Sequence, residues 1–225
     1  MAASTKALEA TLPRKAPNTE QHRAVLNAAS GQYKYQIYAL APSLNDASTL
    51  AQLEREINDA AHDGEGDGDN DDNDDNNKEP SSSSNKGSSA LAAAAAQFAD
   101  GKSTLRDVYE HHVRARDADP SVHPLYFVVA DRADWRAEGL LAVHLDCGYG
   151  EEEDRVGVGR CGVDWADSWG VNLDIGNMDW MDLKEMEEQE WGGEDPYADE
   201  DDEDGGEDGD EDGDGGGGQS KDVSP

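Results

Sequence analysis

Apolar and polar residues alternate along the first third of this chain in a pattern that predicts a helix, a strand and a second helix. Residues 33–38 carry an aromatic or apolar side chain at almost every second position, which is the period of a half-buried strand. The preceding segment, 18–29, begins with capping residues and predicts a short helix. After Asp46, aliphatic residues recur at spacings of three and four, so a second helix is expected there. This order is typical of the start of an α/β unit.

The second half of the chain predicts the remainder of a sheet. Two continuous apolar runs are long enough to be strands buried on both faces. The elements expected here are an Ala-rich, helix-prone stretch at 91–98, a helix that starts after Ser103 or Thr104, strands at 125–130, 140–145 and 156–163, and a helix from about Asp179 to Gln189. The whole pattern predicts an α/β (or α+β) fold, with a small sheet of three to five strands and helices packed on it.

Two acidic runs interrupt this pattern. Residues 63–79 contain nine Asp or Glu residues and residues 185–214 contain eighteen, which together are 27 of the 52 acids in the chain. Such runs bury too little apolar surface to offset the entropy of ordering them. We therefore expect a disordered leader at 1–17, a helix, strand and helix at 18–61, a disordered acidic and Ser-rich insert at 62–89, the remainder of the domain at 90–191, and a disordered acidic Gly-rich tail at 192–225.

The net charge of −34 restricts the partners that the chain can have. Contacts to phosphate need Lys and Arg, so we expect neither direct nucleic-acid binding nor binding to an anionic membrane. Basic proteins, such as histones or other nucleic-acid-binding proteins, are the partners that this charge favours; the alternative is that the acidic segments only keep the chain soluble. The oligomeric state is left open. Cytoplasm or nucleus is the expected location, with Cys147 and Cys161 as buried intracellular thiols.

Short motifs for nucleotide or metal chemistry are incomplete. Gly101–Ser103 ends like a phosphate-binding loop, but Ala96 occupies the position of its first glycine. Residues 157–162 have the glycine spacing of a dinucleotide fingerprint without the long helix that should follow, which favours a bent strand or hairpin near a sheet edge. Residues 208–213 fit the first half of a calcium loop, but Gln219 stands where a bidentate acid is needed. No cofactor and no metal site are expected.

Aromatic and amide side chains gather within sixteen residues near the end of the domain. We call this group the Trp corner; its members are Trp165, Trp169, Asn172, Asn177, Asp179 and Trp180. One interpretation is a packed corner whose Asn and Asp side chains bond adjacent backbone. The other is a concave site with convergent amides and carboxylates, as in a hydrolase or transferase of unknown substrate. Cys147 and His144 could also be a nucleophile and its base; the alternative interpretation is a buried thiol beside a buried histidine.

Three segments follow one another in an order that resembles a known family. They are the apolar runs 125–131 and 140–146, each ending in Asp, and the closing segment Trp169–Trp180. This order resembles an uncharacterised small-domain family of bacteria and fungi, domain of unknown function 6924, and residues 98–105 look like its helix entry. The resemblance covers about residues 98–184 and implies an α/β fold; the family has no established activity, so no catalytic role is carried over. On the evidence of the acidic segments, the predicted function is a noncatalytic protein-interaction module that contacts basic proteins, and catalytic residues are unknown.

Overall fold

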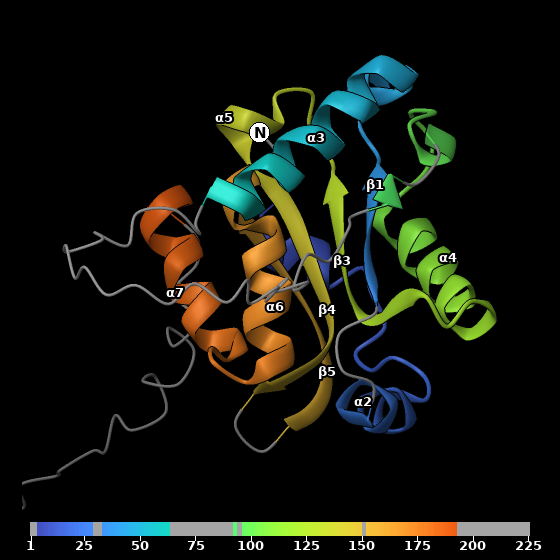
Figure 1. Cartoon of the computed structure of the whole chain (residues 1–225), viewed down its shortest axis with the longest axis vertical. Coiled ribbons are helices and arrows are strands. Elements are labelled where there is room, and N and C mark those ends of the chain that lie inside the picture. Colours follow the sequence, from blue (N-terminus) through green and yellow to red (C-terminus); the bar gives the residue numbers. More distant parts are fainter. Residues whose placement is uncertain (1–3, 29–32, 64–91, 94–95, 150–151, 193–225) are drawn as a thin grey trace, which may run out of the picture.

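The computed structural model describes residues 4–28, 33–63, 92–93, 96–149 and 152–192, which build one mixed sheet (Figure 1). Its strands are β1 (Lys34–Ala39), β2 (Ala92–Ala93), β3 (Val122–Ala130), β4 (Leu140–Tyr149) and β5 (Glu152–Cys161). They lie in the order β2-β1-β3-β4-β5, with parallel pairing from β2 to β3 and antiparallel pairing from β3 to β5. The strand from the N-terminal third is thus part of the same sheet as the later strands, and the α/β prediction is confirmed.

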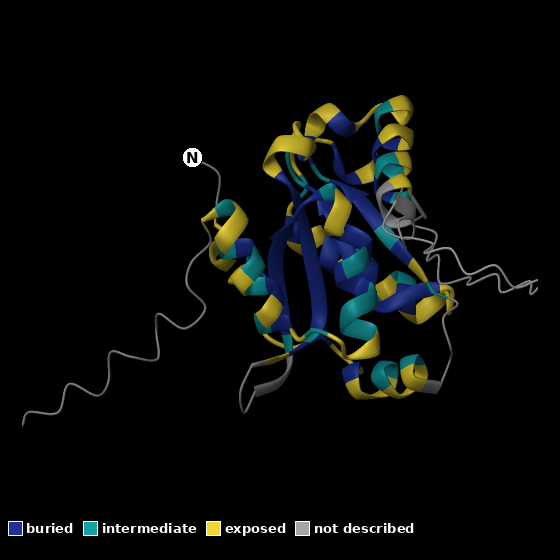
Figure 2. Cartoon of the chain, turned by 60° about the vertical axis from the view of Figure 1, so that its left-hand side comes forward, coloured by how far each residue is buried: buried dark blue, intermediate teal, exposed yellow. Residues whose placement is uncertain are grey.

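Helices cover both faces of this sheet. They are α1 (Thr5–Glu9), α2 (Thr19–Ala28), α3 (Ala47–Asp63), α4 (Leu105–Ala118), α5 (Trp135–Glu138), α6 (Ala166–Ile175) and α7 (Trp180–Trp191), with 3₁₀ turns η1 (Pro42–Leu44), η2 (Ala96–Phe98) and η3 (Val163–Trp165). One hydrophobic cluster joins α3, α6 and α7 to the sheet, and a second joins α1, α2 and α4 to its other face. Figure 2 shows the strands buried between helices whose outer sides are exposed.

The central strand explains why the sheet needs two helical layers. All nine residues of β3 are buried, as its continuous apolar sequence predicts. Tyr126 and Val128 pack into the cluster beneath α3, α6 and α7, whereas Phe127 and Val129 pack toward α4 on the opposite face. Successive side chains of a strand point to opposite faces, so an apolar residue at each position requires cover on both.

The expected elements are confirmed at most positions, and two expectations are corrected. The described residues of the Ala-rich stretch 91–98 do not form the expected α-helix: Ala92 and Ala93 pair in parallel with β1, and the 3₁₀ turn η2 covers Ala96–Phe98. The helix propensity of alanine contributes less free energy here than the hydrogen bonds that Ala92 and Ala93 make with the outer edge of β1, because the backbone groups of that edge need partners. None of the described helices is long and apolar enough to cross a membrane.

The second correction concerns the N-terminal segment, where we expected a disordered leader at 1–17. Residues 4–17 instead contain α1 and three buried side chains, Thr5, Leu12 and Ala16. The Val156 amide donates to the carbonyl of Arg14, so this segment lies along the outer edge of β5. The edge of a sheet presents unpaired N–H and C=O groups. This segment is ordered because it pairs with such groups on the outer edge of β5.

The remaining boundary predictions fall largely on residues that the structure does not describe. Helix α3 continues to Asp63, two residues past the expected end at 61, and α7 ends at Trp191, beside the expected boundary. The rest of the expected acidic insert, 64–89, and of the acidic tail, 193–225, lies outside the described residues. The half calcium loop at 208–213 also lies there.

Candidate functional site

The tryptophans of the Trp corner occupy two different environments. Trp169 of α6 and Trp180 of α7 are buried and pack edge to face, with ring centroids 6.1 Å apart. They lie over Gly159 and Gly157 of β5, where a side chain would collide with the indoles. Trp165, in η3, is 38% exposed and is not part of this pair. The corner is therefore held together by two indoles that belong to the hydrophobic core.

The polar members of the Trp corner bond to groups close to them in sequence. Asn172 donates to the carbonyl of Ser168 (2.8 Å) and accepts from Nδ2 of Asn177 (2.7 Å). Asp179 is the N-cap of α7, and its carboxylate accepts from the amides of Met181 (2.8 Å) and Asp182 (3.0 Å). These are the contacts of a turn and a capping box, in which the side chain satisfies backbone donors that the helix leaves free.

A concavity of about 480 Å³, which we call the corner pocket, lies beside this corner. Arg23 of α2, His144, Asp146 and Cys147 of β4, and Asp174 of α6 contribute to its wall. Two members of the Trp corner, Asp179 and Trp180, also line it, while the other four do not. The structure thus brings part of the predicted group to a pocket and adds β4 and α2, which are far from it in sequence.

Asp174 links three elements at one side of the corner pocket. Its Oδ2 accepts from the hydroxyl of Tyr35 (2.9 Å) and faces Nε2 of His123 (2.8 Å). Because Nδ1 of His123 accepts from the amide of Tyr126 (2.9 Å), the ring proton is on Nε2 and points at Asp174. Burial and the neighbouring carboxylate of Asp174 raise the pKa of Tyr35, so the phenol stays neutral.

Sequence reasoning missed His123 and Tyr35. One signal was present: Pro124 follows His123 directly before an apolar run, and proline removes a backbone donor from a strand. In the structure the pairing of β1 with β3 shifts register between Lys34 and Gln36, in the part of β1 opposite this point. His123 satisfies two β3 amides there, a role that the linear pattern does not reveal.

The pair formed by His144 and Cys147 is in contact, but its electrostatics favour two neutral groups. Sγ of Cys147 lies 3.7 Å from Nδ1 of His144, and the imidazole stacks on Trp180. Burial raises the pKa of Cys147 well above its usual value and lowers that of His144 to about 4. A reactive cysteine needs its thiolate, which this buried environment disfavours. Cys147 and Cys161 are both buried and free, as the sequence predicts.

Arg23 and Asp146 close another side of the corner pocket. The guanidinium donates through Nε (2.6 Å) and a terminal nitrogen (2.5 Å) to the two oxygens of Asp146, a bidentate pair. The carboxylates of the pocket are thus engaged by Arg23, by Tyr35 and His123, or by the N-terminus of α7. No group of three or more His, Cys, Asp or Glu side chains in the described segments is arranged to hold a metal ion.

The part of the chain from β2 to α7 is similar to a known family. No curated protein and no solved structure matches the chain. A family described as a domain of unknown function (DUF6924) matches residues 79–192, which is half of the 225 residues and includes the Trp corner. This match confirms the resemblance found in the sequence. The chain therefore belongs to the DUF6924 family.

Proposed function

We propose that this protein is a noncatalytic protein-interaction module whose acidic segments contact basic proteins. The observation that carries the proposal is the placement of negative charge. Of the 52 acids, 27 fall in the runs 63–79 and 185–214. The first run begins at the last residue of α3 and the second begins inside α7. Charge gathered in two runs creates a stronger local field than the same charge spread over the surface.

The two acidic runs are attached to the same side of the domain. Helices α3 and α7 pack on the same face of the sheet. Both helices end toward the left of the view in Figure 1. A basic partner approaching this side would therefore meet the points where both runs are attached, which supports joint rather than separate engagement.

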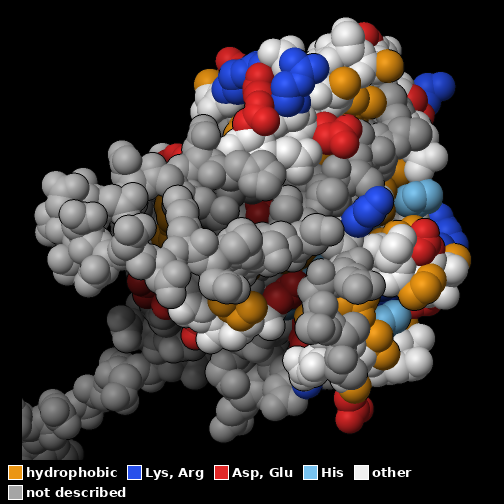
Figure 3. Space-filling model, in the orientation of Figure 1, with side chains coloured by type: hydrophobic (Ala, Val, Ile, Leu, Met, Phe, Trp, Pro, Cys, Tyr) orange, Lys and Arg blue, Asp and Glu red, His pale blue; other side chains and the backbone are white. Residues whose placement is uncertain are grey.

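Helix α7 is itself negatively charged, because the second acidic run begins within it. This helix has Lys184 as its one basic residue, against Asp182 and four glutamates. Elsewhere on the same face, Lys and Arg side chains lie next to Asp and Glu side chains, as at the upper edge of the view in Figure 3. The end of α7 is thus where negative charge has the least compensation on its own element, which favours it as the point of contact for a polycation.

The state of the corner pocket supports binding rather than turnover. Asp146 is paired with Arg23, and Asp179 serves as a helix cap. Burial favours a neutral thiol on Cys147 and a neutral ring on His144. The alternative function, a hydrolase or transferase near Trp169–Trp180, stays a prediction whose best support is the presence of the corner pocket itself.

The proposal is tested with purified core histones as the basic probe. The full chain should bind them at 50 mM salt, and binding should weaken at least tenfold at 300 mM because exposed charges are screened. A chain that ends at Gly192 should bind at least tenfold more weakly than the full chain at 50 mM salt. Isothermal titration calorimetry gives both comparisons. Equal affinity of the full and shortened chains would contradict the proposal.

A length-matched control separates charge from mere bulk. In this variant, every Asp and Glu in 193–225 is replaced by Asn and Gln, so the segment keeps its length and polarity. We expect it to bind histones as weakly as the shortened chain. If the acidic segments served only to keep the chain soluble, the full chain would show no salt-dependent histone binding at all.

A further inference from the structure

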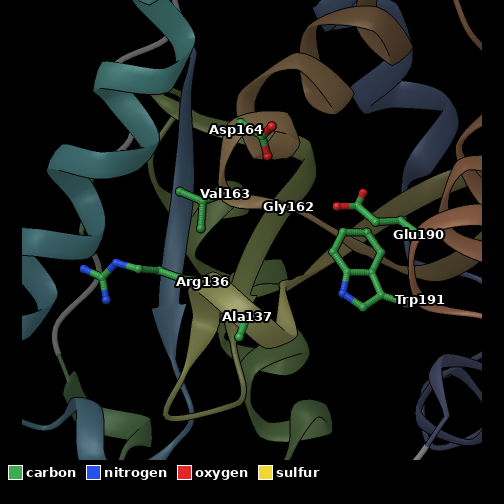
Figure 4. Close-up of a pocket in the computed structure, with 7 residues that line it drawn as sticks. All are labelled: Arg136, Ala137, Gly162, Val163, Asp164, Glu190 and Trp191. Atoms are coloured by element: carbon green, nitrogen blue, oxygen red, sulfur yellow. The ribbon is translucent and has the colours of Figure 1, made fainter.

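A second concavity lies where α5, η3 and the last turn of α7 meet. We call it the tail-end pocket; it has a volume of about 450 Å³ and is lined by Arg136, Ala137, Gly162, Val163, Asp164, Glu190 and Trp191 (Figure 4). Its wall therefore combines one indole, small apolar side chains and three charged groups. Gly192, the C-cap of α7, follows Trp191 directly, so the pocket lies at the point where the sequence 193–225 is attached.

The one cation in this wall is balanced outside the pocket. Arg136 forms an ion pair with Glu56 of α3, and its guanidinium lies 4.5 Å from the ring centroid of Trp135. Figure 4 shows the side chain of Arg136 extending away from Glu190 and Trp191. Its charge therefore does little to neutralise the carboxylates on the other side of the pocket.

The two carboxylates in the wall lack such a partner. Within the part of the chain that the structure describes, neither the Asp164 nor the Glu190 carboxylate makes a hydrogen bond or an ion pair. Partial burial, and after it the nearby charge of Asp164, raise the pKa of Glu190. Gly162 leaves room for this arrangement, because a Cβ there would overlap Oδ1 of Asp164.

The combination fits one chemical class of ligand group. A cation beside Trp191 would gain the attraction of an aromatic ring for positive charge, and the carboxylates would accept its N–H donors. Val163 and the indole offer apolar surface for the methylene stem of a long side chain. An anionic group would face two uncompensated carboxylates, and a purely apolar group would bury them without a partner.

We propose that the tail-end pocket binds a lysine or arginine side chain of a basic partner protein. This inference rests on the proposed function and deepens it, because it gives the partner a specific contact on the folded domain beside the acidic tail. The acidic runs supply long-range attraction, and the pocket supplies a defined seat for one side chain of the partner.

The test uses the full chain and a pair of short peptides. The probe is acetyl-Gly-Ser-Lys-Ser-Gly-amide, and its matched control has norleucine in place of lysine, which keeps most of the stem and removes the charge. The readout is the indole N–H signal of Trp191 in a proton–nitrogen NMR spectrum, assigned with Trp191→Phe. We expect a saturable shift with the lysine peptide and a shift at least fivefold smaller at the same concentration of the norleucine peptide.

Charge variants decide whether the pocket itself is responsible. The double variant Asp164→Asn/Glu190→Gln should weaken the lysine-peptide affinity at least tenfold. Glu188→Gln removes a single charge from the helix that carries Glu190 but lies outside the pocket, so it should change affinity less than twofold. An immobile Trp191 signal, an equal response to norleucine, or an equal loss in Glu188→Gln would each overturn the proposal.

The pocket proposal and the proposed function fail in different ways. If histone binding depends on the acidic tail but is unchanged in Asp164→Asn/Glu190→Gln, and the Trp191 signal does not move, the pocket proposal fails alone. If the full chain shows no salt-dependent histone binding, the proposed function fails as well. A shift of Trp191 together with a reduced histone affinity in the double variant supports both.

Discussion

At two positions of β5, the absence of a side chain makes room for the indoles of the Trp corner. A Cβ at Gly159 would lie 2.8 Å from Trp169, and one at Gly157 would lie 2.5 Å from Sγ of Cys147. Neither glycine needs a backbone conformation that other residues avoid, since positive φ occurs at other described glycines. Their requirement is one of volume, in a core that is packed as densely as an organic crystal.

The first prediction concerns Gly157. Replacing it with alanine forces a methyl group against Cys147 and Trp180, so we expect a loss of about 1–3 kcal/mol in the free energy of unfolding. Gly148→Ala is the matched control, because no atom lies within 4 Å of a Cβ at that position. Urea denaturation followed by tryptophan fluorescence measures both. Equal midpoints for Gly157→Ala and the unaltered chain would contradict this packing.

The second prediction is a pH dependence that arises from His144. Its pKa is about 4 in the folded protein, mainly because of burial, against an ordinary value near 6.5 in the unfolded chain. Between these values the unfolded state binds more protons, so stability falls as the pH falls, whereas above about pH 6.5 the group has no effect. Relative to His144→Gln, the unaltered chain should lose about 1.5 kcal/mol between pH 6.5 and 5.

The comparison with His144→Gln is needed because other groups also titrate in this range. Nearby Asp146 and Asp174 favour the charged imidazole, and His123 opposes it, but burial is the largest effect on its pKa. The difference between the two proteins cancels contributions that they share, including that of the buried His112. Unfolding free energies from urea curves at several pH values supply the measurement, and parallel profiles would show that His144 is not buried as a neutral ring.

At the scale of elements, helix starts were the most predictable features of the chain. Asp46 and Thr104 precede α3 and α4 as expected, and their side chains accept from amides of the first turn. The beginning of α7 at Asp179 was also expected. These signals are local, because a cap needs only a short side chain and the free amides a few residues ahead.

The third prediction tests whether Asp179 acts as a cap. Asp179→Ala should lower the free energy of unfolding by about 1 kcal/mol, because two amides of α7 lose their acceptor. Asp179→Asn keeps an acceptor oxygen and should recover most of that loss. Thermal or urea unfolding distinguishes the variants. A carboxylate retained for chemistry would show the opposite pattern, with little change in stability for either substitution.

At the scale of the whole molecule, the N-terminal segment closes the structure at β5. Thr5 donates to the buried carboxylate of Glu187 in α7 (2.7 Å), and Glu9 accepts from the amide of Val158 (3.0 Å). The backbone of Lys15 pairs with that of Arg155 in β5 as an isolated antiparallel β-bridge. Thr5 and Glu9 thus satisfy groups that lie 182 and 149 positions later in the sequence.

The fourth prediction follows from this closure. Deleting residues 1–16 should lower the free energy of unfolding by at least about 2 kcal/mol, because the buried side chain of Leu12 and the hydrogen-bond partners of the β5 edge are lost. The uncovered edge should also make the chain self-associate, which sedimentation velocity detects. Deleting residues 1–3 alone is the control and should change neither property. A monomeric, fully stable chain without residues 1–16 would contradict this role.

The sequence by itself determined the α/β class, the starts of α3, α4 and α7, the two-sided burial of β3 and the segregation of half the acids into two runs. These follow from local period, capping chemistry and composition, which act over a few residues. The tertiary structure decided the strand at Ala92–Ala93, the packing of residues 4–17, the contact of Asp174 with Tyr35 and His123, and the two pockets. Each of these features depends on which distant segments come into contact. Those contacts are determined by hydrogen-bond satisfaction and close packing rather than by local conformational preference.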